Sequence, residues 1–323
     1  MPISSHIISS GSYLPDRVMT NEDLEKIVET SDEWIVQRSG IKRRHIAAEN
    51  QSTSDMAVEA ARAALDDAGL TPTDIDGIIV ATTTPDQTFP SVAVRVQAAL
   101  GVPVGIAFDV QAVCTGFVYA LSVADNFIKA GQLKRVLVIG AEKMSSVLDW
   151  TDRTTCVLFG DGAGAMVLEA RETPEDSKSG VLSTHLYADG NLKDILYTDG
   201  GVSTTGQSGK IVMHGREVFK HAVNLMSQAV YAALEANDMS VDAIDWLVPH
   251  QANSRIIEST AKKLSMHMDR VIMTVQDHGN TSAASIPLAY DYGRKNDAIK
   301  DGDLVLFEAL GGGLTWGSAL VQL

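Results

Sequence analysis

Short, almost continuously apolar runs alternate along the chain with longer segments in which apolar residues recur every three or four positions. Such runs are typical of strands buried on both faces of a mostly parallel sheet, and the longer segments are typical of helices that cover it. The run Ile106–Val110 predicts one of these strands, and apolar residues from Phe117 to Ile128 recur at helical spacing. Gly131 is expected to end this helix, because glycine favours helix termination. The pattern therefore predicts an α/β chain.

Cys114 lies between this strand and this helix, where the amide groups of a helix N-terminus are exposed. The positive end of the helix dipole favours an anion there, including a thiolate or a developing oxyanion. The alternative is an inert cysteine, because free cysteines behave as small apolar residues and are mostly buried. Cys114 is therefore a candidate nucleophile that needs support from the rest of the chain.

The second half of the chain repeats the pattern of the first half at an offset of 169 positions, or nearly so. Chance similarity between alanine-rich helices and Val/Ile-rich strands is the alternative explanation. Duplication predicts two halves, 1–170 and 171–323, which pack as a layered α/β/α/β/α arrangement. The matching segments are 63–66 and 232–235, 75–79 and 244–248, and 136–139 and 304–307.

Three chemically capable side chains follow the predicted strands. Aligning the two halves by their strand-to-helix junctions places Cys114 opposite Asn280, at an offset of 166. His250 follows the strand 245–248, and ligands bind beside the carboxyl ends of strands in open parallel sheets. Cys114, His250 and Asn280 therefore form a candidate site. His278 could compete for the histidine role, but we expect it to support the loop before Asn280.

A cysteine, a neutral histidine and an asparagine around one cavity can support a condensation between two thioesters. Cys114 can accept an acyl group, with its own amide and that of Gly312, one of three adjacent glycines, holding the carbonyl oxygen anion. His250 and Asn280 can donate hydrogen bonds to a second thioester and stabilise the enolate that forms when a malonyl thioester loses carbon dioxide. A papain-type hydrolase uses the same residue types, but the duplicated pattern gives it no support.

Composition excludes several classes of protein. With 45% hydrophobic and 21% charged residues, the 323-residue chain is not disordered, and its apolar runs are far shorter than a membrane span. The net charge of −15 argues against a general nucleic-acid binder, so an anionic partner must meet a local basic patch. Two cysteines are too few for a disulfide framework, and no secretory signal is expected at the N-terminus. We therefore expect a reducing, cytoplasmic location.

A short helix is expected to begin with Thr30 as its N-cap and Glu33 as the partner in a capping box. Trp34 and Arg38 lie four positions apart and so share a face. They could sandwich a flat heterocycle, although a half-buried Trp beside a solvated Arg is the commoner arrangement. In a later turn-rich loop, Phe89 could pack under its own chain, or reach a pocket or a second subunit.

The glycine-rich segment 159–164 precedes an apolar strand rather than a helix, so we expect close backbone approach there and not a phosphate loop. The charged stretch 172–177 is expected to form a solvated turn. Asn253 is expected to cap a helix on which three basic residues share one exposed side. That side is either a solvated face, with a Glu258–Lys262 pair, or a docking site for an acidic protein. The three basic residues are Arg255, Lys262 and Lys263.

Five ordered motifs together resemble the β-ketoacyl-acyl carrier protein synthase III family, and the likeness spans nearly the whole chain. The resemblance implies a thiolase fold, a homodimer and the first condensation of type II fatty acid synthesis. An acyl group, expected to be acetyl, would pass from coenzyme A to the cysteine, and malonyl-acyl carrier protein would then be decarboxylated and acylated. Coenzyme A would be a substrate, with no cofactor or metal required. The motifs are Thr30–Ala47, Ala112–Phe117, Pro249–Asn253, His278–Ser285 and Gly311–Gly317.

The resemblance also implies roles for individual residues. His250 and Asn280 would be the decarboxylation pair, and Phe89 would cross the dimer to limit the partner's acyl pocket. Leu310 departs from the family, whose members often carry Phe there, and this leaves the shape of the acyl pocket open. The docking residues for the carrier protein would be Arg255, Lys262 and Lys263. The residues contacting coenzyme A would be Trp34, Arg38 and Arg153 at the adenine end, and Phe219, Lys220, Ala252 and Asn253 along the pantetheine tunnel.

Three alternatives to this function remain at the level of sequence. The same fold could serve secondary metabolism, as in quinolone, polyketide or ketone synthesis, with a different acyl primer. A biosynthetic thiolase would be expected to carry a second cysteine near its C-terminus, whereas Cys156 is the only other cysteine here. A non-catalytic subunit that binds carrier protein would be expected to have lost the nucleophile, and Cys114 argues against it.

Overall fold

The computed structural model describes residues 1–174 and 177–323 and contains two central sheets. The first sheet has the order β1-β7-β6-β4-β5, in which β6, β4 and β5 are parallel and β1 and β7 are antiparallel to their neighbours. All five residues of β4 are buried, which explains its continuous apolar sequence. The strands are β1 (Ile3–Tyr13), β4 (Gly77–Ala81), β5 (Ile106–Val110), β6 (Arg135–Lys143) and β7 (Asp161–Glu172).

The second sheet repeats this arrangement with the order β11-β12-β13-β8. β11 and β12 are parallel, and β13 is antiparallel to both of its neighbours. On the free side of β11, a single parallel bridge joins Leu247 and Val271, at the place that β5 occupies in the first sheet. The strands are β8 (Gly180–Ala188), β11 (Trp246–Pro249), β12 (Leu304–Gly311) and β13 (Thr315–Gln322).

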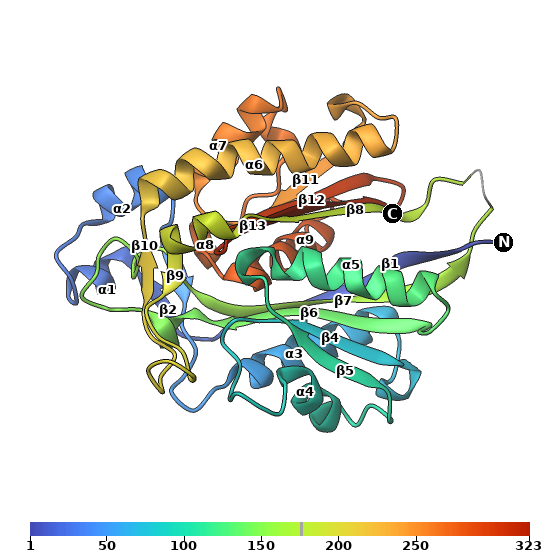
Figure 1. Ribbon diagram of the computed structural model, residues 1–323, viewed down its shortest axis with the longest axis horizontal. Coiled ribbons are helices and arrows are strands. Elements are labelled where there is room, and N and C mark those ends of the chain that lie inside the picture. The colour runs from blue at the N-terminus through green and yellow to red at the C-terminus, as the bar shows by residue number, and fades with distance from the viewer. Residues whose placement is uncertain (175–176) are drawn as a thin grey trace.

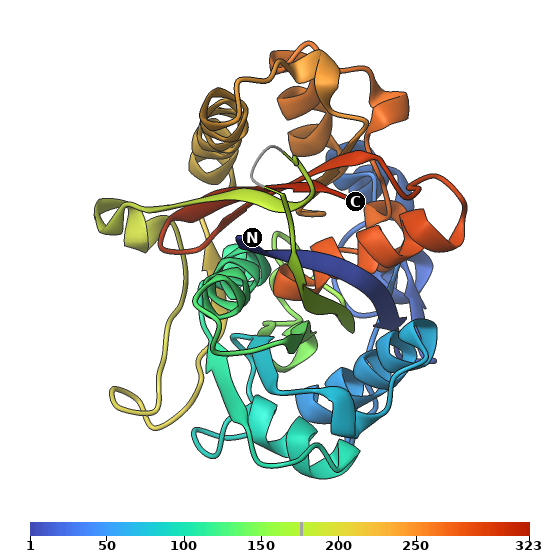
Figure 2. The same cartoon turned by 90° about the vertical axis from the view of Figure 1, so that its right-hand side faces the viewer.

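Helices lie in three layers around the two sheets, so the expected five-layered thiolase-like arrangement is confirmed (Figures 1 and 2). α3 and α4 cover the outer face of the first sheet, and α6 and α7 cover the outer face of the second. α5 and α9 lie between the sheets and contact both. The helices are α3 (Thr53–Ala68), α4 (Val92–Leu100), α5 (Gly116–Lys129), α6 (Gly215–Ala236), α7 (Ser254–Lys263) and α9 (Ser285–Lys295).

The largest part of the core surrounds the two central helices. Phe117, Leu121 and Ile128 of α5 are fully buried and belong to one cluster with side chains from both sheets. Burying side chains of this size contributes roughly 1.5–3 kcal/mol each, so α5 is held from both faces. The packing of α5 on both faces therefore fixes the position of its N-terminus, which follows Cys114.

The duplication at an offset of 169 is evident in the element boundaries, but one expected equivalence is wrong. Short 3₁₀ turns precede α5 and α9 at Val113–Thr115 and Ser282–Ala284, again 169 positions apart. Cys114 is therefore equivalent to Ala283, and the expected pairing with Asn280 is wrong by three residues. Asn280 lies in the loop before the turn, and nothing local in the sequence marks where that loop ends.

The cap expected for the helix of Trp34 is wrong by one residue. α2 (Asp32–Ser39) begins after Ser31, whose hydroxyl accepts a hydrogen bond from the Trp34 amide at 3.2 Å. Thr30 Oγ1 has no hydrogen-bond partner among the described residues. Gly40, with φ 75°, ends the helix in the left-handed conformation that glycine adopts easily.

Several short helices and strands lie mostly at one end of the molecule, beside the carboxyl ends of the parallel strands (Figure 1). The turn expected at 172–177 includes residues 175 and 176, which lie outside the described residues. In the part of the chain that the structure describes, the helices are too short or too polar to cross a membrane. The short elements are β2 (Val18–Thr20), α1 (Asn21–Glu25), β3 (Arg43–His45), β9 (Leu196–Thr198), β10 (Ile211–Met213) and α8 (Val275–His278).

Candidate active site

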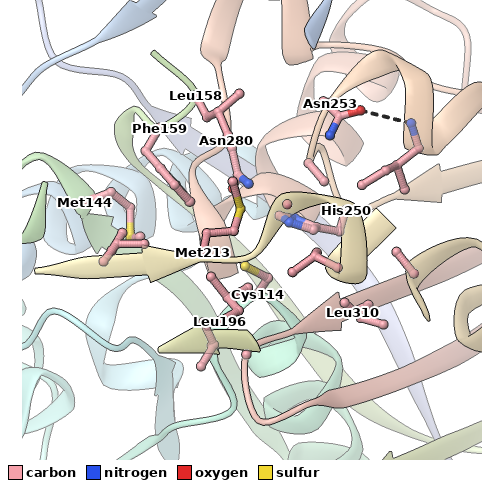
Figure 3. A pocket seen from close by; sticks show the side chains of 18 of the residues that line it. Cys114, Met144, Leu158, Phe159, Leu196, Met213, His250, Asn253, Asn280 and Leu310 are labelled. Atoms are coloured by element: carbon pink, nitrogen blue, oxygen red, sulfur yellow. Dashed lines mark hydrogen bonds between the residues drawn. The ribbon is translucent and has the colours of Figure 1, made fainter. Parts of the chain in front are cut away.

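A cavity of about 950 Å³ opens at the carboxyl ends of β5 and β11, and Cys114, His250 and Asn280 all line it. Figure 3 shows the Cys114 sulfur, the His250 ring and the Asn280 amide nitrogen turned toward the same space. Cys114 comes from the first half of the chain, whereas His250 and Asn280 come from the second. The packing of the two halves thus brings together the three residues that the sequence singled out.

Cys114 is held at the tip of the turn between β5 and α5 and is almost fully buried. Gly311 packs so closely against it that a Cβ on Gly311 would lie 2.7 Å from the Cys114 nitrogen. Burial raises the pKa of the Cys114 thiol to about 12, although the nearby Ser282 hydroxyl acts in the opposite direction. The thiol is therefore protonated in the free protein. Desolvation outweighs the stabilisation that a helix N-terminus offers a thiolate.

His250 is a neutral histidine, as the sequence-based chemistry requires. Burial lowers the pKa of its ring to about 3. Its backbone nitrogen donates to the Glu308 carbonyl at 2.8 Å, which continues the pairing of β11 with β12. Its Nδ1 lies 2.6 Å from Ser285 Oγ at the start of α9. β12 therefore fixes the backbone of His250, and α9 fixes its ring through the contact between Nδ1 and Ser285.

Asn280 has its carboxamide oriented by the backbone. The Ser282 nitrogen donates to Asn280 Oδ1 at 2.9 Å, which leaves the amide hydrogens of Nδ2 available to the cavity. The Asn280 backbone donates to the Leu158 carbonyl at 2.8 Å and accepts from Gly160 at 2.9 Å. A Cβ on Gly160 would lie 2.6 Å from the His278 carbonyl. The expected close backbone approach at the glycine-rich segment is therefore confirmed, and it lies against the loop before Asn280.

Sequence reasoning missed Gln251, the residue that joins the His250 strand to the Asn280 loop. Its buried amide donates to the carbonyls of Pro249 and Ile272, and its oxygen accepts from the amides of Thr274 and Val275. A buried amide with four backbone partners fixes the relative positions of the two segments. Its place in the motif after His250 was the only signal in the sequence.

Glu142 at the end of β6 was also missed. Its fully buried carboxyl accepts hydrogen bonds from the hydroxyl of Thr84 at 2.6 Å, the amide of Thr83 at 3.1 Å and the hydroxyl of Ser282 at 3.1 Å. Burial raises the pKa of this carboxyl despite these bonds. Glu142 therefore ties the first sheet to the turn that precedes α9, directly behind the site.

One mouth of the cavity carries an aromatic side chain flanked by arginines. Trp34 and Arg38 line the cavity and share a face of α2, as expected. The Arg38 guanidinium carbon lies 5.1 Å from the centre of the Trp34 ring, and that of Arg153 lies 4.8 Å from it. The two guanidinium groups and the indole offer stacking surfaces for a flat heterocycle.

Phe219, Ala252, Asn253 and Arg255 line another wall of the cavity. Asn253 caps α7 as expected, since its Oδ1 accepts from the Ile256 amide at 3.0 Å (Figure 3). The Arg255 guanidinium carbon lies 5.7 Å from the Phe219 ring. These residues lead from the cavity to the surface of α6 and α7.

The basic side chains of this surface are exposed to solvent. Lys262 and Lys263 at the end of α7 and Lys220 near the start of α6 are all exposed, and so is Arg255. Among the described ion pairs none joins Glu258 to Lys262, so the pair that belonged to the solvated-face alternative is absent from this structure. Both lysines are nevertheless exposed to solvent, and Lys263 Nζ donates a hydrogen bond to Asn224 Oδ1.

The wall beside the Cys114 sulfur is apolar (Figure 3). Leu310 contributes to it and is almost fully buried. Phe89 lies outside this cavity with 81% of its surface exposed, so the suggestion that it packs under its own chain is wrong. Gly312 lines the cavity near the turn that holds Cys114. The apolar side chains of this wall are Met144, Val147, Phe159, Leu196, Ile211, Met213 and Leu310.

Family models and curated relatives match this chain to the same family of proteins. Two family models match, 3-oxoacyl-[acyl-carrier-protein (ACP)] synthase III over residues 108–190 and its C-terminal region over residues 234–323. The β-ketoacyl-[acyl-carrier-protein] synthase III of Rhodospirillum centenum is 62% identical over 322 residues and that of Cereibacter sphaeroides 60% over 323, each covering 100% of both chains.

Solved structures agree in fold. The 3-oxoacyl-[acyl-carrier-protein] synthase III of Aquifex aeolicus has a TM-score of 0.93 and 49% identity, covering 99% of this chain and 100% of its own. A priming β-ketosynthase from the R1128 polyketide biosynthetic pathway has a TM-score of 0.94 at 33% identity, covering 100% of this chain and 97% of its own.

Proposed function

Because the chain belongs to the 3-oxoacyl-[acyl-carrier-protein] synthase III family, we propose that it catalyses the first condensation of type II fatty acid synthesis from acetyl-coenzyme A and malonyl-acyl carrier protein. The chain is a condensing enzyme of the acyltransferase class, and its family uses acyl-coenzyme A and malonyl-acyl carrier protein as substrates. The observation that carries the proposal is a neutral histidine and an oriented asparagine facing the same cavity as one cysteine.

In the first half-reaction the Cys114 sulfur attacks the acyl carbonyl of acyl-coenzyme A. The amides of Cys114 and Gly312 are the proposed donors to the oxyanion of the tetrahedral intermediate. Collapse of the intermediate forms the Cys114 thioester and breaks the bond to coenzyme A, which leaves as the thiol with the proton that Cys114 gave up. Since the Cys114 thiol is protonated in the free protein, proton transfer accompanies the attack.

In the second half-reaction malonyl-acyl carrier protein replaces coenzyme A. The amide of Asn280 and the ring of His250 donate hydrogen bonds to the malonyl thioester carbonyl. Carbon dioxide leaves, the electrons of the broken bond form an enolate, and the enolate carbon attacks the acyl group on Cys114. The Cys114 thiolate is released and the product is a 3-oxoacyl-acyl carrier protein. A neutral His250 suits this step because it donates a hydrogen bond without adding a buried charge.

The entrance residues have proposed roles in binding the two carriers. Trp34, Arg38 and Arg153 would flank the adenine of coenzyme A, and the exposed basic side chains of α7 would meet the acidic carrier protein. Arg255, Lys262 and Lys263 form a local basic patch on a chain of net charge −15, which supports this assignment. The proposed lining of the pantetheine tunnel is Phe219, Lys220, Ala252 and Asn253.

We propose a homodimer in which Phe89 limits the acyl pocket of the partner subunit. Among the described strands, β5 has β4 as its only neighbour, and each of its residues, Ile106–Val110, is half-buried. An unprotected edge strand with apolar side chains favours pairing with another chain. Phe89 is exposed in the loop that precedes α4, which lies against β5. A cytoplasmic location suits the two free thiols, Cys114 and Cys156.

A role in secondary metabolism is not favoured. The chain is 62% identical to a β-ketoacyl-[acyl-carrier-protein] synthase III but only 33% identical to the polyketide-priming enzyme, although that enzyme has the same fold. The proposed function rests on the closer similarity.

The direct test supplies purified protein with malonyl-acyl carrier protein and a panel of acyl-coenzyme A donors, including acetyl, branched and longer chains. Mass spectrometry of the carrier protein should detect 3-oxobutyryl-acyl carrier protein with the acetyl donor. Equal amounts of carbon dioxide and product should form. Absence of condensation product with every donor would refute the proposal, and a strong preference for a longer donor would correct the expected primer.

A further inference from the structure

Ser285 lies directly behind the His250 ring, at the first position of α9. Its Oγ is 2.6 Å from His250 Nδ1, and the backbone nitrogen of Gln251 donates to the same Oγ at 3.3 Å. All three residues are almost fully buried. Since bulk water does not reach these groups, the hydrogens must be shared among the protein atoms themselves.

The available hydrogens select one arrangement. A serine hydroxyl has one hydrogen to donate and two lone pairs to accept with. If His250 Nδ1 carried the ring proton, it would donate to Ser285 Oγ, and the serine hydrogen would need another acceptor. Within the described residues, the recorded hydrogen bonds of Ser285 Oγ are only those with His250 and Gln251. All the groups are satisfied if Ser285 accepts from Gln251 and donates to Nδ1.

We propose that Ser285 is a positioning residue that holds His250 as the Nε2–H tautomer. A neutral imidazole has one proton, so a hydrogen bond from the serine to Nδ1 requires that proton to be on Nε2. Nε2 has no hydrogen bond to any of the described residues, so it is the ring nitrogen available to the cavity that His250 lines. The other tautomer would present a lone pair to the thioester oxygen and would repel the charge that develops there.

The duplicated architecture supports a specific role for this hydroxyl. The position equivalent to Ser285 in the first half, at an offset of 169, is Gly116, which follows the equivalent turn. The strand-to-helix corner of this fold therefore forms without a hydroxyl group. The second half, which carries His250, has a serine at this position, and this serine can donate a hydrogen bond to the histidine ring. The first half has glycine there.

The tautomer can be measured without any assumption about the reaction. Protein labelled with ¹⁵N-histidine should give, for His250, a protonated Nε2 and an unprotonated Nδ1 in long-range ¹H–¹⁵N spectra at neutral pH. The His250→Ala spectrum identifies the signal among the eight histidines. A protonated Nδ1 in the wild-type protein would overturn the proposal, even if the enzyme condenses thioesters as proposed.

The kinetic test rests on the proposed function and separates the two half-reactions. Ser285→Ala should slow decarboxylation of malonyl-acyl carrier protein about 10- to 100-fold, the range seen when partners that orient a metal-bound imidazole are removed. Acylation of Cys114 by acetyl-coenzyme A should change by less than about twofold, and Ser285→Thr should recover most of the decarboxylation.

Ser9→Ala is the matched control. Ser9 is also buried and donates to a backbone carbonyl, that of Ala64 at 2.7 Å, but it lies on β1 away from the cavity. This control should leave both half-reactions unchanged. The proposal would be refuted if Ser285→Ala lost the same factor in both half-reactions and melted at a lower temperature than Ser9→Ala. Ser285 would then have only a structural role.

Discussion

Val113 and Ser282 occupy equivalent positions 169 residues apart, and their φ angles are 51° and 50°. Residues other than glycine rarely adopt this conformation, and a β-branched residue such as Val113 does so only under strain. Each residue immediately precedes the tip of its turn, where the first half has Cys114 and the second has Ala283. The strained strand-to-helix turn therefore occurs in both halves of the duplicated fold, whereas the thiol at its tip occurs only in the first half.

Cys114→Ser should abolish labelling by acetyl-coenzyme A, because the hydroxyl is a far weaker nucleophile than the sulfur in the same buried turn. Radiolabelled acetyl-coenzyme A followed by peptide mapping measures the effect. Cys156→Ser is the matched control, since Cys156 is also a buried free thiol but does not line the cavity. Persistent labelling of Cys114→Ser would remove Cys114 as the nucleophile.

His250→Ala and Asn280→Ala should each be acylated normally but release carbon dioxide about 100- to 1000-fold more slowly, the usual cost of one lost oxyanion donor. Release of ¹⁴CO₂ from labelled malonyl-acyl carrier protein measures this step. His278→Gln should retain release within about tenfold, because the His278 ring lies against His45 and Tyr292 and does not line the cavity. Normal release by His250→Ala would contradict its assignment.

Replacing Lys262 and Lys263 together with Glu should raise the Michaelis constant for malonyl-acyl carrier protein about tenfold, because an acidic partner would then meet like charge. Acetyl transfer from coenzyme A should be unaffected. The same double reversal at Lys134 and Lys300 is a charge-matched control, since both are exposed and precede the amino ends of their strands, away from the cavity. Equal losses in the two steps would count against docking at α7.

Glu308 should make the stability of the protein decrease as pH rises. It lies on β12 opposite Pro249, fully buried, and neither carboxyl oxygen has a hydrogen-bond partner among the described residues. Burial raises its pKa to about 8. Above the ordinary glutamate pKa the unfolded chain loses this proton, whereas the folded protein keeps it until about pH 8, so unfolding becomes easier across that window.

Urea unfolding at pH 6 and pH 8 measures this effect. One pKa unit corresponds to about 1.4 kcal/mol, so the wild-type protein should lose about 2 kcal/mol more than Glu308→Gln over this range. The glutamine has a similar shape but cannot ionise. An identical pH dependence for the two proteins would show that Glu308 does not retain its proton in the folded state.

The sequence by itself determined the architecture and the three central residues. Continuous apolar runs specify strands buried on both faces, and the offset of 169 specifies a second copy of the same unit. Both features can be read directly from the order of the residues, so neither depends on knowing the folded structure. Cys114 and His250 could be singled out because they follow such strands. Asn280 was singled out by aligning the two halves at an offset of 166, which the structure corrects to 169. The ordered motifs also contain Asn280, and the resemblance added the remaining entrance residues.

Only the tertiary structure decided the electrostatic state of the site and the contacts that orient it. The neutral state of His250 and the raised pKa of the Cys114 thiol are consequences of burial, which depends on both halves packing together. Ser285 and Glu142 reach the site through contacts with residues 35 and 140 positions away. Such contacts leave no periodic signal in the sequence, because their geometry exists only after the two sheets and the helices between them have assembled.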